Sequence, residues 1–181
     1  MKVVETDGFV FRFEDAIDAF VFDEQDKSKP TFHGAPMKGV DIVVELEDKY
    51  LYIELKDYDD PSIYDISKIS TEDDEKAIQD GFTWLKRYLK YKFRDTYLYR
   101  HAEGKVEKPV VYFCLTTFDN ALNSIMQKQL KKELPVGKVS PRWVKAIAKS
   151  CFVMNPQKWN ENFPRWPVTR SENDPGSGGN E

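Results

Sequence analysis

Two apolar segments separated by a short polar stretch constrain the fold most. Residues 39–46 read GVDIVVEL and residues 49–58 read KYLYIELKDY. Side chains alternate between the two faces of a strand, so a turn at Glu47-Asp48 puts the apolar residues of both strands on one face. These residues are Ile42, Val44, Leu46, Leu51, Ile53 and Leu55. The pattern predicts a β-hairpin over residues 39–57 with one face in a core.

Outside the hairpin, segments with a helix pattern alternate with segments that have a strand pattern. A continuous apolar run at residues 109–117, PVVYFCLTT, is typical of a central strand covered on both faces. Asp119 is a suitable N-cap for the helix after it. Helices are predicted at residues 12–23, 73–94, 118–134 and in a short segment from Ser140, and a last strand at residues 151–155. Two patterns overlap near the first helix: Phe9, Phe11 and Phe13 alternate as in a strand, whereas Phe13, Ile17, Phe20 and Val21 recur as in a helix, and the helix is preferred. This order predicts a single mixed α/β domain over residues 1–170, followed by a disordered polar tail at 171–181.

Composition narrows the class of protein. Of the 181 residues, 40% are hydrophobic, which is enough for one sizeable core. No apolar run reaches the ~18–20 residues of a membrane span, and the first residues, MKVVETDGFVF, do not read as a secretory signal. Cys114 and Cys151 lie in apolar surroundings and are expected to be buried, reduced thiols. These features favour a cytoplasmic protein without a membrane partner.

The net charge of −4 conceals an uneven distribution. Residues 1–75 carry 21 acidic and 8 basic side chains, whereas residues 76–170 carry 7 acidic and 19 basic ones. Within the basic part, Lys86, Lys90 and Arg94 recur every four residues and therefore share one face of a helix. Such a stripe is either a solvated helix face or a contact for nucleic-acid phosphates. The sequence leaves both interpretations open.

The predicted hairpin also brings charged residues together. Asp41 on the first strand, and Glu54 and Lys56 on the second, lie on the face opposite the apolar one. With a turn at Glu47-Asp48, Asp41 is directly across from Glu54, and the Cβ atoms of cross-strand neighbours are ~4.5–5.5 Å apart. Two carboxylates at this distance repel each other unless a positive charge compensates them.

A divalent cation would remove this repulsion. Mg²⁺ typically binds one or two carboxylates together with water and phosphate oxygens. The ion polarises a phosphodiester and lowers the pKa of a bound water, and Lys56 would add positive charge beside that water. Asp41, Glu54 and Lys56 are therefore candidate catalytic residues, the two acids as ligands of Mg²⁺ or of Mn²⁺ in its place. The alternative is a surface ion-pair cluster, although such pairs contribute only ~0–1 kcal/mol to stability.

The same residues resemble a known group of nucleases. GVDIVV followed by YIELKDY is similar to the core of the PD-(D/E)xK superfamily, the restriction-endonuclease-like nucleases, although Val40 replaces the proline before Asp41. The resemblance covers residues 10–116. It implies a mixed central β-sheet flanked by α-helices, a metal held by Asp41 and Glu54, and a lysine, Lys56, that positions or activates the attacking water.

The resemblance also implies residues outside the hairpin. The family pattern often adds an acidic metal ligand from an N-terminal helix, for which Glu14 fits best and Asp18, one turn later, is the substitute. A polar auxiliary residue often comes from the helix after the third strand, where Gln79 is the candidate. A homodimer would suit cleavage of both strands of a duplex.

Two classes of function are consistent with these features. One is a Mg²⁺-dependent nuclease that hydrolyses phosphodiester bonds of nucleic acid, with DNA as the expected substrate. The other is a non-catalytic module of the same fold that binds nucleic acid or protein. The intact set of Asp41, Glu54 and Lys56 favours the nuclease. The aromatic residues Trp143, Trp159, Phe163 and Trp166 could stack on bases, but packing onto the core is the preferred interpretation.

Overall fold

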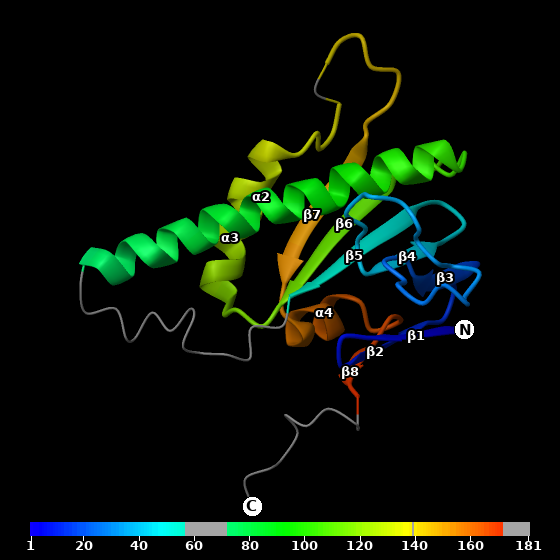
Figure 1. Ribbon diagram of the computed structural model, residues 1–181, viewed down its shortest axis with the longest axis horizontal. Helices are drawn as coiled ribbons and strands as arrows, with labels where there is room; N and C mark the ends of the chain where they lie inside the picture. The colour runs from blue at the N-terminus through cyan, green and yellow to red at the C-terminus, as the bar shows by residue number, and fades with distance from the viewer. Residues whose placement is uncertain (57–71, 139, 172–181) are drawn as a thin grey trace, which may run out of the picture.

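The computed structural model describes residues 1–56, 72–138 and 140–171, with residues 72–80 described through their backbone alone. Eight strands and three helices follow one another in this part of the chain (Figure 1). The strands are β1 Lys2–Thr6, β2 Phe9–Phe13, β3 Asp18–Val21, β4 Ile42–Glu45, β5 Tyr50–Lys56, β6 Val110–Thr116, β7 Ala148–Met154 and β8 Val168–Arg170. The helices are α2 Glu72–Ala102, α3 Asn120–Glu133 and α4 Pro156–Asn162.

The strands form two sheets. The larger has five strands in the order β3-β4-β5-β6-β7, and the smaller has three in the order β1-β2-β8. In the larger sheet β3, β4 and β5 are antiparallel neighbours, whereas β6 is parallel to both β5 and β7. The smaller sheet is antiparallel throughout. The predicted mixed α/β fold is therefore confirmed.

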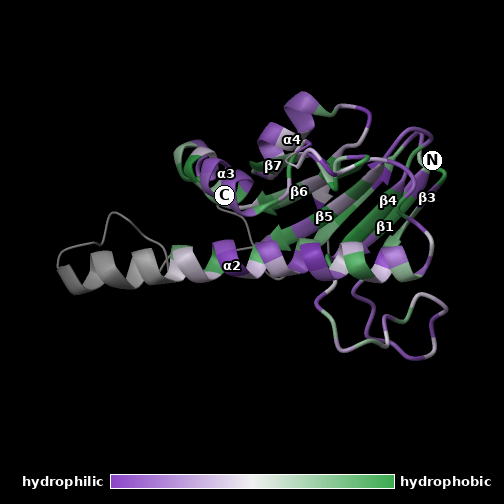
Figure 2. Cartoon of the chain, turned by 90° about the horizontal axis from the view of Figure 1, so that it is seen from above, coloured by the Kyte–Doolittle hydropathy of each residue, from purple (hydrophilic) through white to green (hydrophobic). Residues whose placement is uncertain are grey.

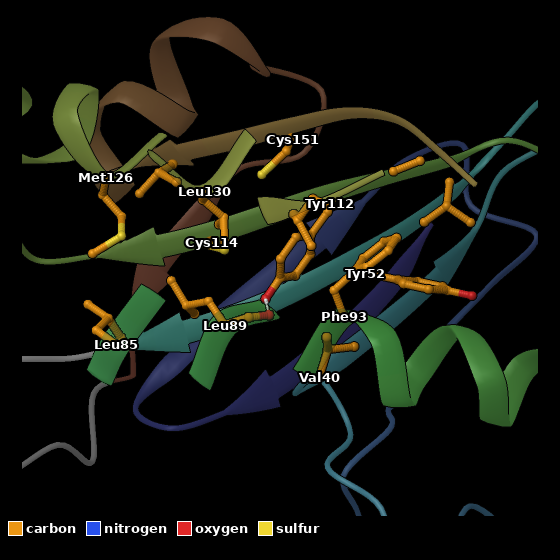
Figure 3. Packing of buried hydrophobic residues seen from close by; sticks show 14 of the residues in the cluster. Val40, Tyr52, Leu85, Leu89, Phe93, Tyr112, Cys114, Met126, Leu130 and Cys151 are labelled. Carbon is orange, nitrogen blue, oxygen red and sulfur yellow. Dashed lines mark hydrogen bonds between the residues drawn. The ribbon is translucent and has the colours of Figure 1, made fainter. Parts of the chain in front are cut away.

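Two helices cover one face of the larger sheet. Leu85, Leu89 and Phe93 of α2 are buried against Tyr52 of β5 and Tyr112 of β6, and α3 adds its own apolar side chains to this layer (Figure 3). The Tyr112 hydroxyl donates a hydrogen bond to the Leu89 carbonyl over 3.0 Å. This bond satisfies a buried polar group and fixes α2 over the middle of the sheet.

The opposite face is covered by the small sheet and α4, so that α2 and α4 lie on opposite sides of the strands (Figure 2). Trp159 of α4 is fully buried and meets Phe11 of β2 and Phe113 of β6, with ring centres 5.9 and 4.8 Å away. Phe163 and Trp166 pack on the same cluster. Core packing, the preferred interpretation of the sequence, is confirmed for Trp159, Phe163 and Trp166, whereas Trp143 belongs to neither core cluster.

The central hairpin forms as predicted. β4 and β5 pair with Ile42 opposite Ile53 and Val44 opposite Leu51, and these four side chains are buried on the predicted apolar face. The other face differs from the expectation. Tyr50, Tyr52 and Val43 on that face are buried as well, because α2 covers it.

The helix predicted at residues 12–23 is wrong. Phe9–Phe13 is strand β2 and Asp18–Val21 is strand β3. The alternation of Phe9, Phe11 and Phe13 is the pattern of strand β2, and β1 and β8 pair with the two edges of this strand. Ile17, an expected inner position of the helix, is 54% exposed.

Two further differences concern helices. α2 continues to Ala102 instead of ending at residue 94, since buried Thr96 and Arg100 extend its inner face with polar side chains. It is followed by Gly104 in the left-handed region, a common end to a helix. The helix predicted from Ser140 is wrong, because the described residues between 140 and 147 form turns and bends. The N-cap at Asp119 is confirmed.

The cysteines and the membrane expectation can also be compared with the structure. Cys114 and Cys151 are buried and free, as predicted. Within the described ranges, none of the helices combines the length and apolar character that a bilayer crossing requires. Of the tail predicted to be disordered at 171–181, Ser171 is instead buried and donates a hydrogen bond of 2.6 Å to Glu5 Oε1, and residues 172–181 lie outside the described residues.

Candidate active site

The candidate site lies at the end of the larger sheet where the parallel strands β5 and β6 finish. Lys56 is the last residue of β5 and pairs with Thr116, the last residue of β6. β4 runs in the opposite direction, so Asp41, which directly precedes β4, lies at the same end. Ligand sites of α/β sheets are commonly found beyond the carboxyl ends of parallel strands.

The hairpin register places the two predicted acids opposite each other. β4 and β5 pair Ile42 with Ile53, so the next position along the ladder puts Asp41 across from Glu54, as predicted. Their burial was not foreseen: Asp41 is 8% exposed and Glu54 is fully buried. The surface ion-pair interpretation therefore does not apply to these two residues.

Backbone contacts fix Asp41 in place. Its Oδ2 accepts a hydrogen bond of 2.6 Å from the Leu55 N–H. Its carbonyl accepts one of 2.8 Å from the Phe22 N–H, which joins it to the chain after β3. The preceding residue, Val40, donates its N–H to Thr96 Oγ1 of α2 over 2.9 Å. Asp41 is thus held by two strands, with α2 anchoring its neighbour.

Two lysines approach the carboxylates. Lys92 of α2 is 4% exposed, and its Nζ lies 3.5 Å from Asp41 Oδ1 and 3.4 Å from Glu54 Oε2. The same Nζ lies 3.2 Å from Asp23 Oδ2. Lys56 Nζ lies 2.8 Å from Glu54 Oε1. Three carboxylates and two ammonium groups therefore form one continuous charged cluster.

The positive charge in this cluster does not fully compensate the acids. Burial raises the pKa of Glu54 to about 8, with a further contribution from the charge of Asp41, and Lys92 and Lys56 offset this only in part. Burial also raises the pKa of Asp41, against the effects of Lys92 and of the Leu55 N–H. Both Glu54 oxygens are buried, and no described residue gives either of them a hydrogen bond of good geometry. The site therefore has room for additional positive charge.

Both lysines remain cationic at neutral pH. Burial alone would lower the pKa values of Lys56 and Lys92, but the carboxylates of Glu54 and Asp41 raise both. The ring of Tyr88 contributes as well, since its centre lies 4.8 Å from Lys56 Nζ and 5.5 Å from Lys92 Nζ. A cation close to an aromatic face is attracted by the ring quadrupole.

Sequence reasoning missed three members of this site, which are Asp23, Tyr88 and Lys92. Lys92 could have been found from its spacing, because it lies three residues after Leu89 and beside Phe93 on the inner side of α2. Tyr88 precedes it by one helical turn. Asp23 could not have been found while residues 12–23 were assigned to a helix, since it approaches Lys92 only because β3 pairs with β4.

The structure does not bring the predicted additional acids to this site. Glu14 is exposed and lies 3.6 Å from Arg165. Asp18 pairs with Glu45 at the far end of β4 from Asp41, and its carboxylate lies 3.6 Å from Lys2. Neither lies in the charged cluster with Asp41, because residues 12–23 do not form the predicted helix. Asp23 is the third acid of the cluster instead.

Gln79, the predicted auxiliary residue, has its backbone in α2, but its side chain lies outside the described residues.

The three residues of the predicted basic stripe on α2 differ in their contacts. Lys86 and Lys90 lie 3.9 and 2.7 Å from Glu133 of α3, so they connect the two helices. Arg94 is exposed on the same helix.

Oxygen atoms of Asp41 and Glu54 are the groups that could hold a metal here. No set of three or more His, Cys, Asp or Glu side chains is arranged around a common point within residues 1–56, 81–138 and 140–171. Mg²⁺ does not need such a set, because it usually keeps several waters and binds one or two carboxylates. The Glu54 oxygens, which have ionic contacts but no hydrogen bond of good geometry with a described residue, and the raised pKa values of both acids fit this ion. Lys92 would have to yield its position between them.

Comparison of the chain with protein-family models, with curated proteins and with solved structures gives no match.

Proposed function

We propose that this protein is a metal-dependent nuclease that hydrolyses phosphodiester bonds of nucleic acid, with DNA as its substrate. One observation carries the proposal: Asp41 and Glu54 face each other in a buried site that is short of positive charge, and Lys56 lies 2.8 Å from Glu54. Strained electrostatics of this kind are concentrated at functional sites.

Asp41 and Glu54 are the residues that would hold Mg²⁺, and the ion would polarise the phosphodiester and lower the pKa of a bound water. Lys56 is 24% exposed at the sheet end, so its ammonium can approach an attacking water and the charge that develops on phosphorus. Lys92 keeps Asp23 as a partner at 3.2 Å when the two inner carboxylates are neutralised by a cation. The chain therefore supplies both the ligands and an alternative partner for the displaced lysine.

The strand order supports the restriction-endonuclease-like assignment. β3 provides a strand before the hairpin, so Asp41 directly precedes the second strand of an antiparallel unit, and Glu54 and Lys56 belong to the third. α2 then connects this unit to β6, which is parallel to β5. A mixed sheet with helices on it is what the resemblance implies.

A second function, a non-catalytic module that binds nucleic acid, is favoured by Lys92. Its Nζ is within 3.5 Å of both inner carboxylates and compensates part of their charge without any metal. In a protein that never binds a cation, this lysine would serve as a permanent counter-ion. The two functions differ in whether cleavage occurs and in whether Mg²⁺ stabilises the protein.

The deciding experiment incubates purified protein with supercoiled, linear and single-stranded DNA and with RNA, in Mg²⁺, in Mn²⁺ and in chelator. Metal-dependent cleavage is expected. Lys56→Ala should lower turnover about a hundred-fold or more while metal binding is retained, because this lysine acts on charge that develops in the transition state. Asp41→Asn should remove both cleavage and the stabilisation by Mg²⁺.

Lys49→Ala is the matched control, since Lys49 lies at the turn of the same hairpin beside Asp48. Cleavage by this variant should equal that of the parent. Cleavage that survives Lys56→Ala unchanged would show that the proposed mechanism is wrong. Retention of nucleic acid without any cleavage, and no thermal shift with Mg²⁺, would establish the binding module instead.

A further inference from the structure

An exposed aromatic surface lies on α2, one helical turn before the candidate site. Trp84 is 56% exposed, and its ring stacks on that of Tyr88 with ring centres 5.1 Å apart and planes inclined by 20°. Trp84 belongs to neither core cluster, whereas Tyr88 is partly buried against the cluster under α2. Exposed aromatic area of this size gives up hydrophobic stabilisation, so the fold alone does not explain it.

Positively charged side chains lie close to the ring of Tyr88 and to the neighbouring ring of Tyr91. Lys38 Nζ lies 4.9 Å from the Tyr88 ring centre, and Lys56 Nζ lies 4.8 Å from it. Arg87 lies 5.7 Å from the ring centre of Tyr91, one turn of helix away from Trp84 on the same surface. The surface therefore combines flat aromatic faces with several positive charges.

A hollow of about 220 Å³ lies in this surface. Its lining residues are Lys38, Trp84, Arg87, Tyr88 and Tyr91. They provide two cations and three aromatic rings, and none of them carries a carboxylate. Such a lining complements a ligand that is both planar and anionic. Nucleotides combine these two properties, because each joins a base to a phosphate.

We infer that this hollow is a subsite for an unpaired nucleotide of the substrate strand. The base stacks on Trp84, and the neighbouring phosphates contact Lys38 and Arg87. Tyr88 connects the subsite to the candidate site, because its ring contacts Lys56 as well as Trp84. A phosphodiester next to the stacked base is thereby directed towards Lys56.

This inference rests on the proposed function, since it assigns the substrate class of the same site. The bases of a duplex are stacked on each other and do not present a free face, whereas an unpaired base does. The subsite therefore selects single strands, or single-stranded ends and flaps of a duplex, over fully paired DNA. Stacking is tolerant of sequence, so no base preference is expected from it.

Equilibrium binding in chelator tests the subsite without any need for cleavage. The probes are fluorescein-labelled oligothymidylate, an abasic sugar-phosphate strand of the same length, and a duplex. The parent protein should prefer oligothymidylate to both others. Trp84→Ala should weaken binding of oligothymidylate roughly ten-fold or more, and should leave binding of the abasic strand unchanged.

Two further variants separate the aromatic contribution from charge and from folding. Trp84→Phe should restore most of the affinity, because it keeps a flat ring. Lys38→Ala should weaken both single strands alike and should reduce the dependence of binding on salt concentration. Leu98→Ala is the control, since Leu98 is a 60% exposed apolar residue of the same helix outside the hollow. Its affinities should equal those of the parent.

The outcomes distinguish this inference from the proposed function. Equal affinity of Trp84→Ala and the parent for oligothymidylate would overturn the subsite, whether or not the protein cleaves DNA. An equal loss on the abasic strand would do the same, because it would indicate a charge or folding effect. If the protein binds these probes as described but cleaves no substrate, the subsite would be supported and the proposed nuclease activity would be wrong.

Discussion

The β4–β5 hairpin carries a charged group at each of its ends. At the turn end, Glu45 accepts a hydrogen bond of 2.6 Å from Lys108, and this bond lowers the pKa of Glu45. At the other end, burial raises the pKa of Glu54 to about 8 in spite of Lys56 and Lys92. The same pair of strands therefore holds one carboxylate whose ionised form is favoured and one whose ionised form is disfavoured.

Burial accounts for the difference. The side chains of Glu45 and Lys108 are 17% and 21% exposed, so water still solvates their charges. The Glu54 side chain is not exposed at all, and its oxygens have ionic contacts without well-formed hydrogen bonds. Partly exposed pairs add a little stability, whereas a buried group with a raised pKa lowers it. The comparison therefore indicates that the end with Glu54 is maintained for function, because it does not add stability.

The largest expected effect is on stability. Lys92→Met should lower the free energy of unfolding by about 3–5 kcal/mol at pH 8 in chelator, since it leaves two buried carboxylates without their shared counter-ion. Lys108→Met, the corresponding change at the turn end, should cost about 0–1 kcal/mol. Urea denaturation measures both. Equal losses in the two variants would show that the ends do not differ as described.

A smaller effect concerns metal binding. Asp23→Asn removes the carboxylate that is left to partner Lys92 when a cation takes Asp41 and Glu54. The stabilisation by Mg²⁺ should then weaken by about 1 kcal/mol, roughly a five-fold loss of affinity. Asp18→Asn should leave the thermal shift unchanged, because Asp18 contacts Lys2 at the other end of the sheet. A greater loss in Asp18→Asn than in Asp23→Asn would restore the metal-ligand role first predicted for Asp18.

A third expected effect is on the slope of stability with pH, and it has opposite signs at the two ends. Glu54 has a raised pKa, so the folded protein in chelator holds its proton more tightly than the unfolded chain. Its stabilising contribution is present below pH 4.5 and is lost as the pH rises towards 8. Glu45 has a lowered pKa, so its contribution is present above pH 4.5 and is lost in acid.

Two variants measure these slopes separately. In Glu54→Gln, stability should no longer fall between pH 5 and 8, whereas in Glu45→Gln part of the loss below pH 4.5 should disappear. Denaturation curves across the pH range provide the data. A parent protein whose stability rises between pH 5 and 8, with Glu54→Gln unchanged, would contradict the assignment of the raised pKa.

The opposition of Asp41 and Glu54 could be predicted because a hairpin has few degrees of freedom. The alternation of apolar side chains fixes which residues share a face, and a short turn fixes the register. The N-cap at Asp119 could be predicted for the same reason, since its side chain only has to accept a hydrogen bond from a backbone N–H of the first helical turn. These features depend on residues close together in the chain.

The burial of the site could not be predicted in the same way. It depends on the direction in which α2 crosses β5, and this direction is set by contacts such as Tyr112 with Leu89. Lys92 lies in a basic stretch that is typical of a solvated face, and only the docked helix makes it internal. Asp23 required the correct assignment of β3, but the spacing of Ile17, Phe20 and Val21 favours a helix over this segment.

The pairing of β2 with β8 has a consequence for synthesis of the protein. Arg12 donates a side-chain hydrogen bond to Thr169 Oγ1 across this pair, and the two residues are 157 positions apart in the chain. Translation at roughly 5–20 residues per second leaves the first hairpin without β8 and α4 for on the order of ten seconds. Phe11 is fully buried in the folded protein, and during that time it lacks its ring contact with Trp159. The small sheet therefore closes only after β8 has been synthesised, and until then its apolar face lacks these partners.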